Sequence, residues 1–432
     1  MQNVQRKFIK FLFLIKTILI NPFKMFFSKI MYVKNKNLIL KLKNKECIRV
    51  VFLVANKSIW KADHIFNNML KDDFFDPMIL VIPTTGINEE LQSELLSNTY
   101  QYFLDKNYPT ISSFDEKNNS WVKLESLVPD ILFFSSPHKQ TVKEYYEAAY
   151  QKYPSCYAGY GMHTARYGLN QGQYNKWFHN SLWKVFVQNQ NMVEDYQRYS
   201  NIKKDHIHLV LDNIVEDLTN PERKETAAWE NSDAKKRIIW APHHTINKND
   251  PLQLATFLQY ADFFQQLAER TKEHVIWCFK PHPVLKNKLY CHPGWGKERT
   301  DEYYTYWENS DYSQINEGEY IDLFRQSDAL VHDSASFIAE YHFTQKPMLY
   351  LMTSHTKANL NEFGHACLHA ADEAWNTDDI ENFVYKVVDE TISAKYQQKE
   401  LIDKYFQDLK IKNGLLSVSS IIKNQIKQAY YL

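Results

Sequence analysis

Glycine is scarce in this chain, with 10 residues among 432, which excludes a collagen-like repeat and a glycine-rich phosphate loop. The five cysteines form no CxxC pair, and their scattered positions indicate neither a disulfide framework nor a zinc-finger spacing. The formal net charge is zero, so no global field favours nucleic acid as a partner. Apolar residues, by contrast, are plentiful. Hydrophobic residues make up 44% of the chain and aromatic residues 15%, which is enough to form packed cores and argues against disorder.

Acidic residues are missing from positions 1–45, where basic and large apolar side chains are interleaved. No apolar run there approaches the roughly 20 residues that a spanning helix needs, and no small-residue cleavage site follows, so neither a transmembrane helix nor a signal peptide is expected. We interpret residues 1–46 as a basic amphipathic segment lying on an anionic membrane surface, which predicts a peripheral protein on the cytoplasmic face of the cell membrane. The alternative is a helix that packs on the domain and happens to be basic.

The length exceeds what one hydrophobic core usually supports, so two domains are expected. Short buried strands alternate with amphipathic helices in both halves, which is typical of doubly wound α/β domains. Strands are expected at 50–54, 78–82, 131–134, 156–160, 184–188 and 207–211, and then at 237–241, 275–279, 329–331 and 348–351.

We place one Rossmann-like domain at 47–222 and a second at 223–395, facing each other across a cleft. Residues 396–432 are expected to form helices that pack back across the hinge. Residues 285–318 carry mostly aromatic and polar loop character.

Polar clusters directly follow four of the predicted strands, at 159–166, 241–245, 280–283 and 333–340. In open parallel sheets, ligands bind outside the carboxyl ends of the strands. Random polar residues would fall at the opposite edge as well, so four clusters at one edge favour a ligand site.

The fourth cluster places Ser334 and Ser336 between a strand and a helix expected at 337–343, where unpaired N–H groups and the helix dipole favour a phosphate. Glu340 lies about one turn further on and can accept hydrogen bonds from ribose hydroxyls. A nucleotide diphosphate fits this element. The alternative is that a serine is only an N-cap and Glu340 a first-turn acid.

Four further side chains can donate to the same phosphates, namely Lys280, His282, His244 and Thr245. The prolines at 281 and 283 hold their loop rigid, so these donors are placed in advance. The alternatives are a proline turn with a solvated lysine and a purely structural turn at 244–245.

His163 lies beside glycines that permit close approach of a substrate. A neutral imidazole there can take a proton from an attacking hydroxyl, whereas the alternative is a satisfied, half-buried histidine. The pairs His243-His244 and His206/His208 have no matching carboxylates, and there is no DxD triplet. Neither a metal nor another cofactor is therefore expected.

Residues 237–355 resemble the CDP-glycerol glycerophosphotransferase family of teichoic acid and capsule polymerases. The resemblance rests on a strand ending in Trp-Ala-Pro at 240–242, on Lys280 with His282, and on Ser-Asp-Ala-Leu-Val-His-Asp-Ser-Ala-Ser at 327–336 with its trailing Lys-Pro at 346–347. The segment at 161–164, Gly-Met-His-Thr, is a less regular counterpart of the family's His-Gly-Thr. Ala335 separates serines that are usually adjacent in the family, and histidines stand at 243–244 where a basic residue is common.

The resemblance implies the GT-B fold, peripheral membrane binding, and transfer of glycerol phosphate from CDP-glycerol to a hydroxyl of a lipid-linked cell-wall or capsular polymer. It would make His163 the catalytic base, His282 a phosphate-contacting histidine, and Ser334 and Ser336 pyrophosphate-binding hydroxyls. The domain at 47–222 would then hold the acceptor and the domain at 223–395 the donor nucleotide.

Glu340 with the Lys-Pro pair at 346–347 is also similar to nucleotide-sugar transferases of the same fold, including capsular Kdo transferases, which have a segment like the Lys-Pro-His-Pro at 280–283. A glycosyltransferase using CMP-Kdo, a UDP-sugar or a GDP-sugar in surface polysaccharide synthesis is therefore an alternative. A non-catalytic membrane scaffold of that fold is a second alternative.

Overall fold

The protein is described from a computed structural model that covers residues 2–115, 117–159, 161–167, 170–230, 235–250 and 252–429, with the backbone alone for 2–18, 171 and 413. Its contacts divide the chain into two compact units. Unit 1 comprises residues 1–161, 169–213 and 409–432, and unit 2 comprises residues 162–168 and 214–408. Neither unit is a single continuous stretch of the chain. Residues 162–168 belong to unit 2 although the chain on both sides of them belongs to unit 1, and residues 409–432 return to unit 1.

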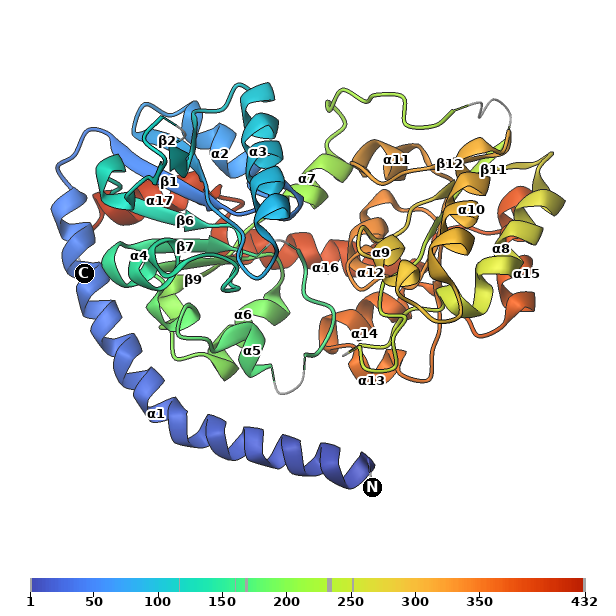
Figure 1. Ribbon diagram of the computed structural model, residues 1–432, viewed down its shortest axis with the longest axis horizontal. Helices are drawn as coiled ribbons and strands as arrows, with labels where there is room; N and C mark the ends of the chain where they lie inside the picture. The colour runs from blue at the N-terminus through green and yellow to red at the C-terminus, as the bar shows by residue number, and fades with distance from the viewer. Residues whose placement is uncertain are drawn as a thin grey trace. The chain divides into compact units, whose positions relative to one another are not determined.

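Unit 1 is built on a seven-stranded parallel sheet with the order β3-β2-β1-β6-β7-β8-β9 (Figure 1). Its strands are β1 (Ile48–Val54), β2 (Phe75–Val81), β3 (Thr110–Ser112), β6 (Ile131–Phe134), β7 (Ser155–Ala158), β8 (Lys184–Val187) and β9 (Ile207–Leu209). The central strands are apolar and buried along almost their whole length, as expected where helices cover both faces of a parallel sheet. A short antiparallel pair, β4 (Phe114–Asp115) and β5 (Ser120–Trp121), lies outside this sheet.

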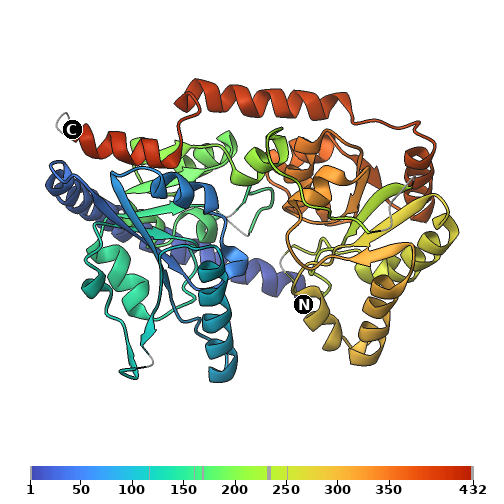
Figure 2. The same cartoon turned by 90° about the horizontal axis from the view of Figure 1, so that it is seen from above.

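The helices of unit 1 include two from opposite ends of the chain. They are α1 (Gln2–Leu42), α2 (Asp63–Leu70), α3 (Glu89–Asp105), α4 (Glu147–Lys152), α5 (Gln171–Tyr174), α6 (Gln190–Tyr199) and α17 (Val418–Lys427). Helix α17 contacts α2 and α1 (Figure 2). Its residues Ile421, Ile422 and Ile426 are buried in the same core as β1. The C-terminus of the chain therefore completes the core of the first unit.

Unit 2 contains a six-stranded parallel sheet with the order β12-β11-β10-β13-β14-β15. In chain order this is 3-2-1-4-5-6, the arrangement of a Rossmann fold. The strands are β10 (Lys236–Ala241), β11 (Val275–Phe279), β12 (Ser313–Ile315), β13 (Ala329–His332), β14 (Met348–Leu351) and β15 (Asp372–Ala374). The two Rossmann-like parallel sheets confirm the predicted fold class.

Unit 2 contains the α-helices α8 (Phe257–Thr271), α9 (Leu285–Tyr290), α10 (Gly296–Asn309), α11 (Ile321–Gln326), α12 (Phe337–Glu340), α13 (Thr356–Asn359), α14 (Glu362–His369) and α15 (Thr377–Val388). Four of these helices, α9, α10, α13 and α14, were not predicted from the sequence. Helix α7 (Asn213–Thr219) begins at the boundary between the units, and α16 (Tyr396–Asn413) runs from unit 2 into unit 1.

The expectation of a loop at 285–318 is wrong, because α9, α10 and β12 occupy it. Aromatic residues have weak helix propensity, yet Tyr303, Tyr304 and Trp307 are buried on one face of α10. Packing of that face against Trp240 and Phe279 outweighs the propensity.

Two boundaries differ from those placed on the sequence. The contacts divide the units between residues 213 and 214, whereas the sequence analysis placed the change between 222 and 223. Helix α12 ends at Glu340 and continues as a 3₁₀ helix over Tyr341–Thr344, so the α-helix expected at 337–343 is shorter.

Candidate active site

Three loops of unit 2 meet at the carboxyl edge of its sheet. Strand β10 pairs with β11 on one side and with β13 on the other, and Ala241 is in register with His332. The loops at 242–245, 280–283 and 333–336 therefore leave the sheet side by side. The strand order reverses between β10 and β13, and such a switch point is where Rossmann-type sheets bind their ligands.

Asp333 connects its own loop to the loop at 242–245 and to Thr256. Its side chain is fully buried and accepts hydrogen bonds from the backbone N–H of His243 at 2.5 Å, the N–H of Thr256 at 2.5 Å and the Thr256 hydroxyl at 2.8 Å. Burial raises the pKa of Asp333 to about 6, while the hydrogen bonds from Thr256 and His243 favour its ionised form. Asp333 was not predicted as a site residue, although its place directly after a buried strand is a signal in the sequence.

Lys280 is buried, and its ammonium group is already bonded to protein oxygens. It donates to Asn316 Oδ1 at 2.7 Å and to the carbonyl of Gly318 at 2.9 Å, and lies 5.3 Å from the centre of the Tyr320 ring. Tyr320 in turn donates its hydroxyl hydrogen to Glu340 Oε2 at 2.7 Å. The structure thus brings Lys280 and Glu340 to the same tyrosine, and Glu340 is buried there.

The two serines of the fourth cluster lie together, with 3.5 Å between their hydroxyl oxygens. Ser334 is buried and Ser336 is exposed. Ser336 is the residue that precedes α12, but its side chain makes no capping hydrogen bond. The alternative of a serine that serves only as an N-cap therefore has no support at Ser336.

Three histidines lie close together in the loops that follow β10 and β11. His244 and His282, both predicted site residues, have ring centres 4.2 Å apart, and His243 adds a third ring 4.4 Å from His244. Thr245 is buried, and its Oγ1 accepts from the N–H groups of Leu254 and Ala255 at 3.0 and 3.2 Å. The sequence analysis assigned no role to His243.

His163 belongs to unit 2 by its contacts, although the sequence analysis placed it in the N-terminal domain. Asn361 donates from Nδ2 to the carbonyl of His163 at 2.7 Å, and its backbone N–H donates to the carbonyl of Thr164 at 2.9 Å. Ala165 forms an isolated antiparallel bridge with Leu360, and the Thr164 hydroxyl donates to the carbonyl of Ala335. The segment at 162–167, called here the His163 segment, is thereby bonded to the loop that carries Ser334 and Ser336. Tyr160, which precedes it in the same motif, lies outside the described residues.

Gly364, in α14, allows this segment to approach. A Cβ atom at that position would lie 2.1 Å from the carbonyl oxygen of Thr164, a distance that a side chain cannot occupy. Asn361 also caps α14, because its Oδ1 accepts from Gly364 N–H at 2.8 Å. The sequence analysis missed both residues, although an asparagine immediately before a helix is a recognisable cap signal.

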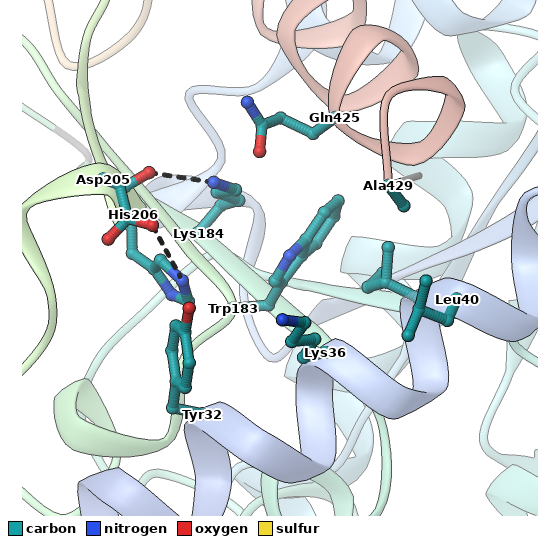
Figure 3. Close-up of a pocket in the computed structure, with 10 residues that line it drawn as sticks. Tyr32, Lys36, Leu40, Trp183, Lys184, Asp205, His206, Gln425 and Ala429 are labelled. Carbon is teal, nitrogen blue, oxygen red and sulfur yellow. Dashed lines mark hydrogen bonds and ion pairs between the residues drawn. The ribbon is translucent and has the colours of Figure 1, made fainter. Parts of the chain in front are cut away.

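A separate pocket in unit 1 lies between α1, α17 and β8 (Figure 3). It encloses about 30 Å³, room for roughly two water molecules and not for a nucleotide. Its wall includes Lys184, a buried cation that donates to the carbonyl of Asp205 at 2.9 Å. None of the predicted site residues lines it.

The chain is thus an α/β protein of two Rossmann-like parallel sheets, with the candidate site at the switch point of the second sheet. Residues 146–407, more than half of the chain, match the family described as CDP-Glycerol:Poly(glycerophosphate) glycerophosphotransferase. The chain belongs to this family, which confirms the resemblance seen in the sequence.

Solved structures share the fold at low sequence identity. Two variants of the wall teichoic acid polymerase TagF are 14% and 12% identical, each with a TM-score of 0.54. The first match covers 99% of this chain and 99% of that chain, the second 98% and 99%. A UDP-GlcNAc 2-epimerase from Methanocaldococcus jannaschii, solved with UDP-GlcNAc and UDP, is 14% identical with a TM-score of 0.51 and covers 84% of this chain and all of its own. No curated protein sequence matches this chain.

Proposed function

We propose that the protein transfers glycerol phosphate from CDP-glycerol to a hydroxyl of a lipid-linked cell-wall or capsular polymer. The family membership supports the reaction type, and the contact between the His163 segment and the serine loop carries the residue assignment. That contact brings a candidate base and candidate phosphate donors onto one unit, at the switch point of its sheet.

In this proposal His163 takes the proton of the acceptor hydroxyl. The acceptor oxygen forms a bond to the β-phosphorus of CDP-glycerol, the bond from that phosphorus to the bridging oxygen breaks, and CMP leaves. Ser334, Ser336, His244, Thr245 and His282 hold the phosphates as charge grows on the leaving group. Lys280 and Glu340 are already bonded within the protein, so we assign Lys280 to the local positive potential and Glu340 to the ribose side of the site.

The acceptor is lipid-linked, and we propose that α1 holds the protein at the cytoplasmic face of an anionic membrane. One face of α1 packs on unit 1 through Ser28, Met31, Asn35, Ile39 and Leu42. A second apolar stripe, made of Leu19, Phe23, Phe26, Ile30 and Val33 and called here the exposed stripe, is open to solvent. Exposed lysines at 29 and 41 lie on the same helix, as in helices that rest on anionic lipid. No helix among the described residues has the length and apolarity to cross a bilayer.

The donor is tested by thermal unfolding of the full chain with CDP-glycerol, CMP-Kdo, a UDP-sugar and a GDP-sugar in parallel. A donor at 100 times its dissociation constant stabilises the protein by about 2.7 kcal/mol, and we expect this shift for CDP-glycerol alone. Ser334→Ala should reduce the shift, whereas Ser126→Ala, in a surface turn of unit 1, should leave it unchanged. A shift with only a nucleotide-sugar would replace the proposal by a glycosyltransferase, and no shift with any donor would favour a scaffold.

A further inference from the structure

Three imidazole rings from two adjacent loops form a compact cluster in unit 2. His243 and His244 follow β10, and His282 follows β11. One ring nitrogen from each histidine lies within 4.8 Å of the other two. The backbone N–H of His282 donates to the carbonyl of Pro242 at 3.1 Å, so a direct hydrogen bond holds the two loops together.

A neutral imidazole ring has one nitrogen that carries no hydrogen and can offer its lone pair to a ligand. His244 Nδ1 is buried and has no hydrogen-bond partner among the described residues. A buried nitrogen acceptor without a donor leaves a place for a ligand that accepts a lone pair.

The surroundings of the cluster are compatible with a cation. His243 Nδ1 lies 3.0 Å from Thr245 Oγ1, a contact that can orient the ring as the outer partners of metal-binding histidines do. The ammonium group of the neighbouring Lys288 is paired with both oxygens of Asp250 at 2.9 Å, which offsets its repulsion of a cation.

One contact opposes metal binding. His282 Nδ1 accepts a hydrogen bond from the N–H of Val284 at 3.2 Å, so binding through its other nitrogen would move a proton to Nδ1 and break this bond. The contact is long and solvent-exposed, and water can take over the N–H of Val284.

We propose that His243, His244 and His282 bind one divalent transition-metal ion of the zinc, cobalt or nickel kind. Imidazole ligands suit these ions, whereas Mg²⁺ and Ca²⁺ prefer oxygen ligands. Three protein ligands leave a fourth position open, as in catalytic rather than structural zinc sites. Metal binding itself does not depend on the proposed function, but use of the open position by a donor phosphate oxygen rests on it. With the ion bound, His244 and His282 would act on the phosphates through the ion and not by direct contact.

The sequence analysis expected no metal because the histidine pair at 243–244 has no carboxylate partner. The third ligand is instead a histidine from the next loop, 38 residues or more away in sequence, and only the pairing of β10 with β11 brings it there. A sequence search for carboxylates could not have found it.

The test is direct titration of the full chain, purified without a polyhistidine tag and stripped with chelator, using Co²⁺ followed by visible absorption and Zn²⁺ followed by calorimetry. We expect one equivalent of either ion to bind, with no comparable binding of Mg²⁺. His244→Ala and His282→Ala should each weaken binding at least tenfold, and His369→Ala, an exposed histidine at the end of α14, should not. Circular dichroism of the variants separates loss of a ligand from loss of the fold.

Binding that survives both cluster variants would overturn the proposal, as would binding no tighter than that of Mg²⁺. Inorganic phosphate that binds the metal-free protein and loses affinity in the same two variants, while Zn²⁺ does not bind, would make the cluster an anion site instead. A CDP-glycerol thermal shift that persists in chelator without metal uptake would refute the metal site and leave the proposed function standing.

Discussion

At the scale of single residues, the most constrained position near the candidate site is Gly364. Replacement by alanine places a methyl group where the carbonyl oxygen of Thr164 lies, so the segment that carries His163 must move. We expect Gly364→Ala to fold with a loss of about 1–3 kcal/mol in stability and to lower kcat at least tenfold. The KM for the donor should change little, because the serine loop stays in place.

The measurement is steady-state kinetics on CDP-glycerol, beside His163→Ala. Gly172→Ala is the matched control, since nothing lies within 4 Å of a Cβ at that position. Normal turnover of folded Gly364→Ala would show that the position of the His163 segment does not matter for the chemistry. Normal turnover of folded His163→Ala would remove the base assignment itself.

Lys184 provides a test of stability against pH. Burial lowers its pKa to about 8 from an ordinary value of 10.5. Between these two values the unfolded chain binds a proton that the folded chain does not, so stability rises as the pH increases from 8 to 10.5, by up to about 3 kcal/mol. Below pH 8 the cost of burying the charge is constant.

Lys184→Met removes the buried charge, so we expect the variant to be more stable than the parent at pH 7 by about 1–2 kcal/mol, after the lost bond to Asp205 is counted. It should also lack the rise between pH 8 and 10. Urea unfolding of both proteins at pH 7 and pH 10 measures the two slopes. Equal slopes would mean that Lys184 is solvated in the folded protein.

At the scale of secondary-structure elements, helix α1 has two faces with apolar side chains. One face packs against the rest of unit 1, and the other, the exposed stripe, is open to solvent. The exposed stripe repeats at intervals of four and three residues, so its members share one face of the helix. Its sequence pattern predicted an amphipathic segment, but only the structure shows which stripe packs on the protein and which remains open.

Phe23→Ser with Phe26→Ser should weaken binding to vesicles of anionic phospholipid at least tenfold, because each phenylalanine contributes about 1.5–3 kcal/mol when buried in the lipid. Cosedimentation measures the effect, with neutral vesicles for comparison. Ile411→Ser, which removes a similarly exposed apolar side chain from α16, is the control. Unchanged sedimentation of the double variant would argue that the exposed stripe does not contact the membrane.

At the scale of the whole molecule, the two units exchange segments, and the C-terminal exchange can be tested. Truncation after Asp408 removes α17 and with it Ile421, Ile422 and Ile426 from the core of unit 1. Loss of that burial amounts to several kcal/mol, since each isoleucine contributes about 1.5–3 kcal/mol. Unit 1 should therefore unfold at a lower temperature, while unit 2 keeps its transition.

Differential scanning calorimetry of the truncated and full chains resolves the two transitions, and added CDP-glycerol should stabilise only the transition of unit 2. Deletion of residues 2–18 is the comparison for loss of a terminal segment. A unit 1 transition that is unchanged after truncation at 408 would show that α17 contributes little to its core.

The sequence by itself determined the two α/β units and the loops of the candidate site, because buried parallel strands such as β10 and β13 are continuous apolar runs and end where polar residues begin. It did not determine α10, whose aromatic face favours a helix only once it packs against Trp240 and Phe279. Only the tertiary structure shows that His163 belongs to unit 2. The same is true of the cluster that His282 forms with His243 and His244. Both depend on contacts between residues far apart in the chain, such as Asn361 with His163, and such contacts leave no local pattern that a reading of neighbouring residues can detect.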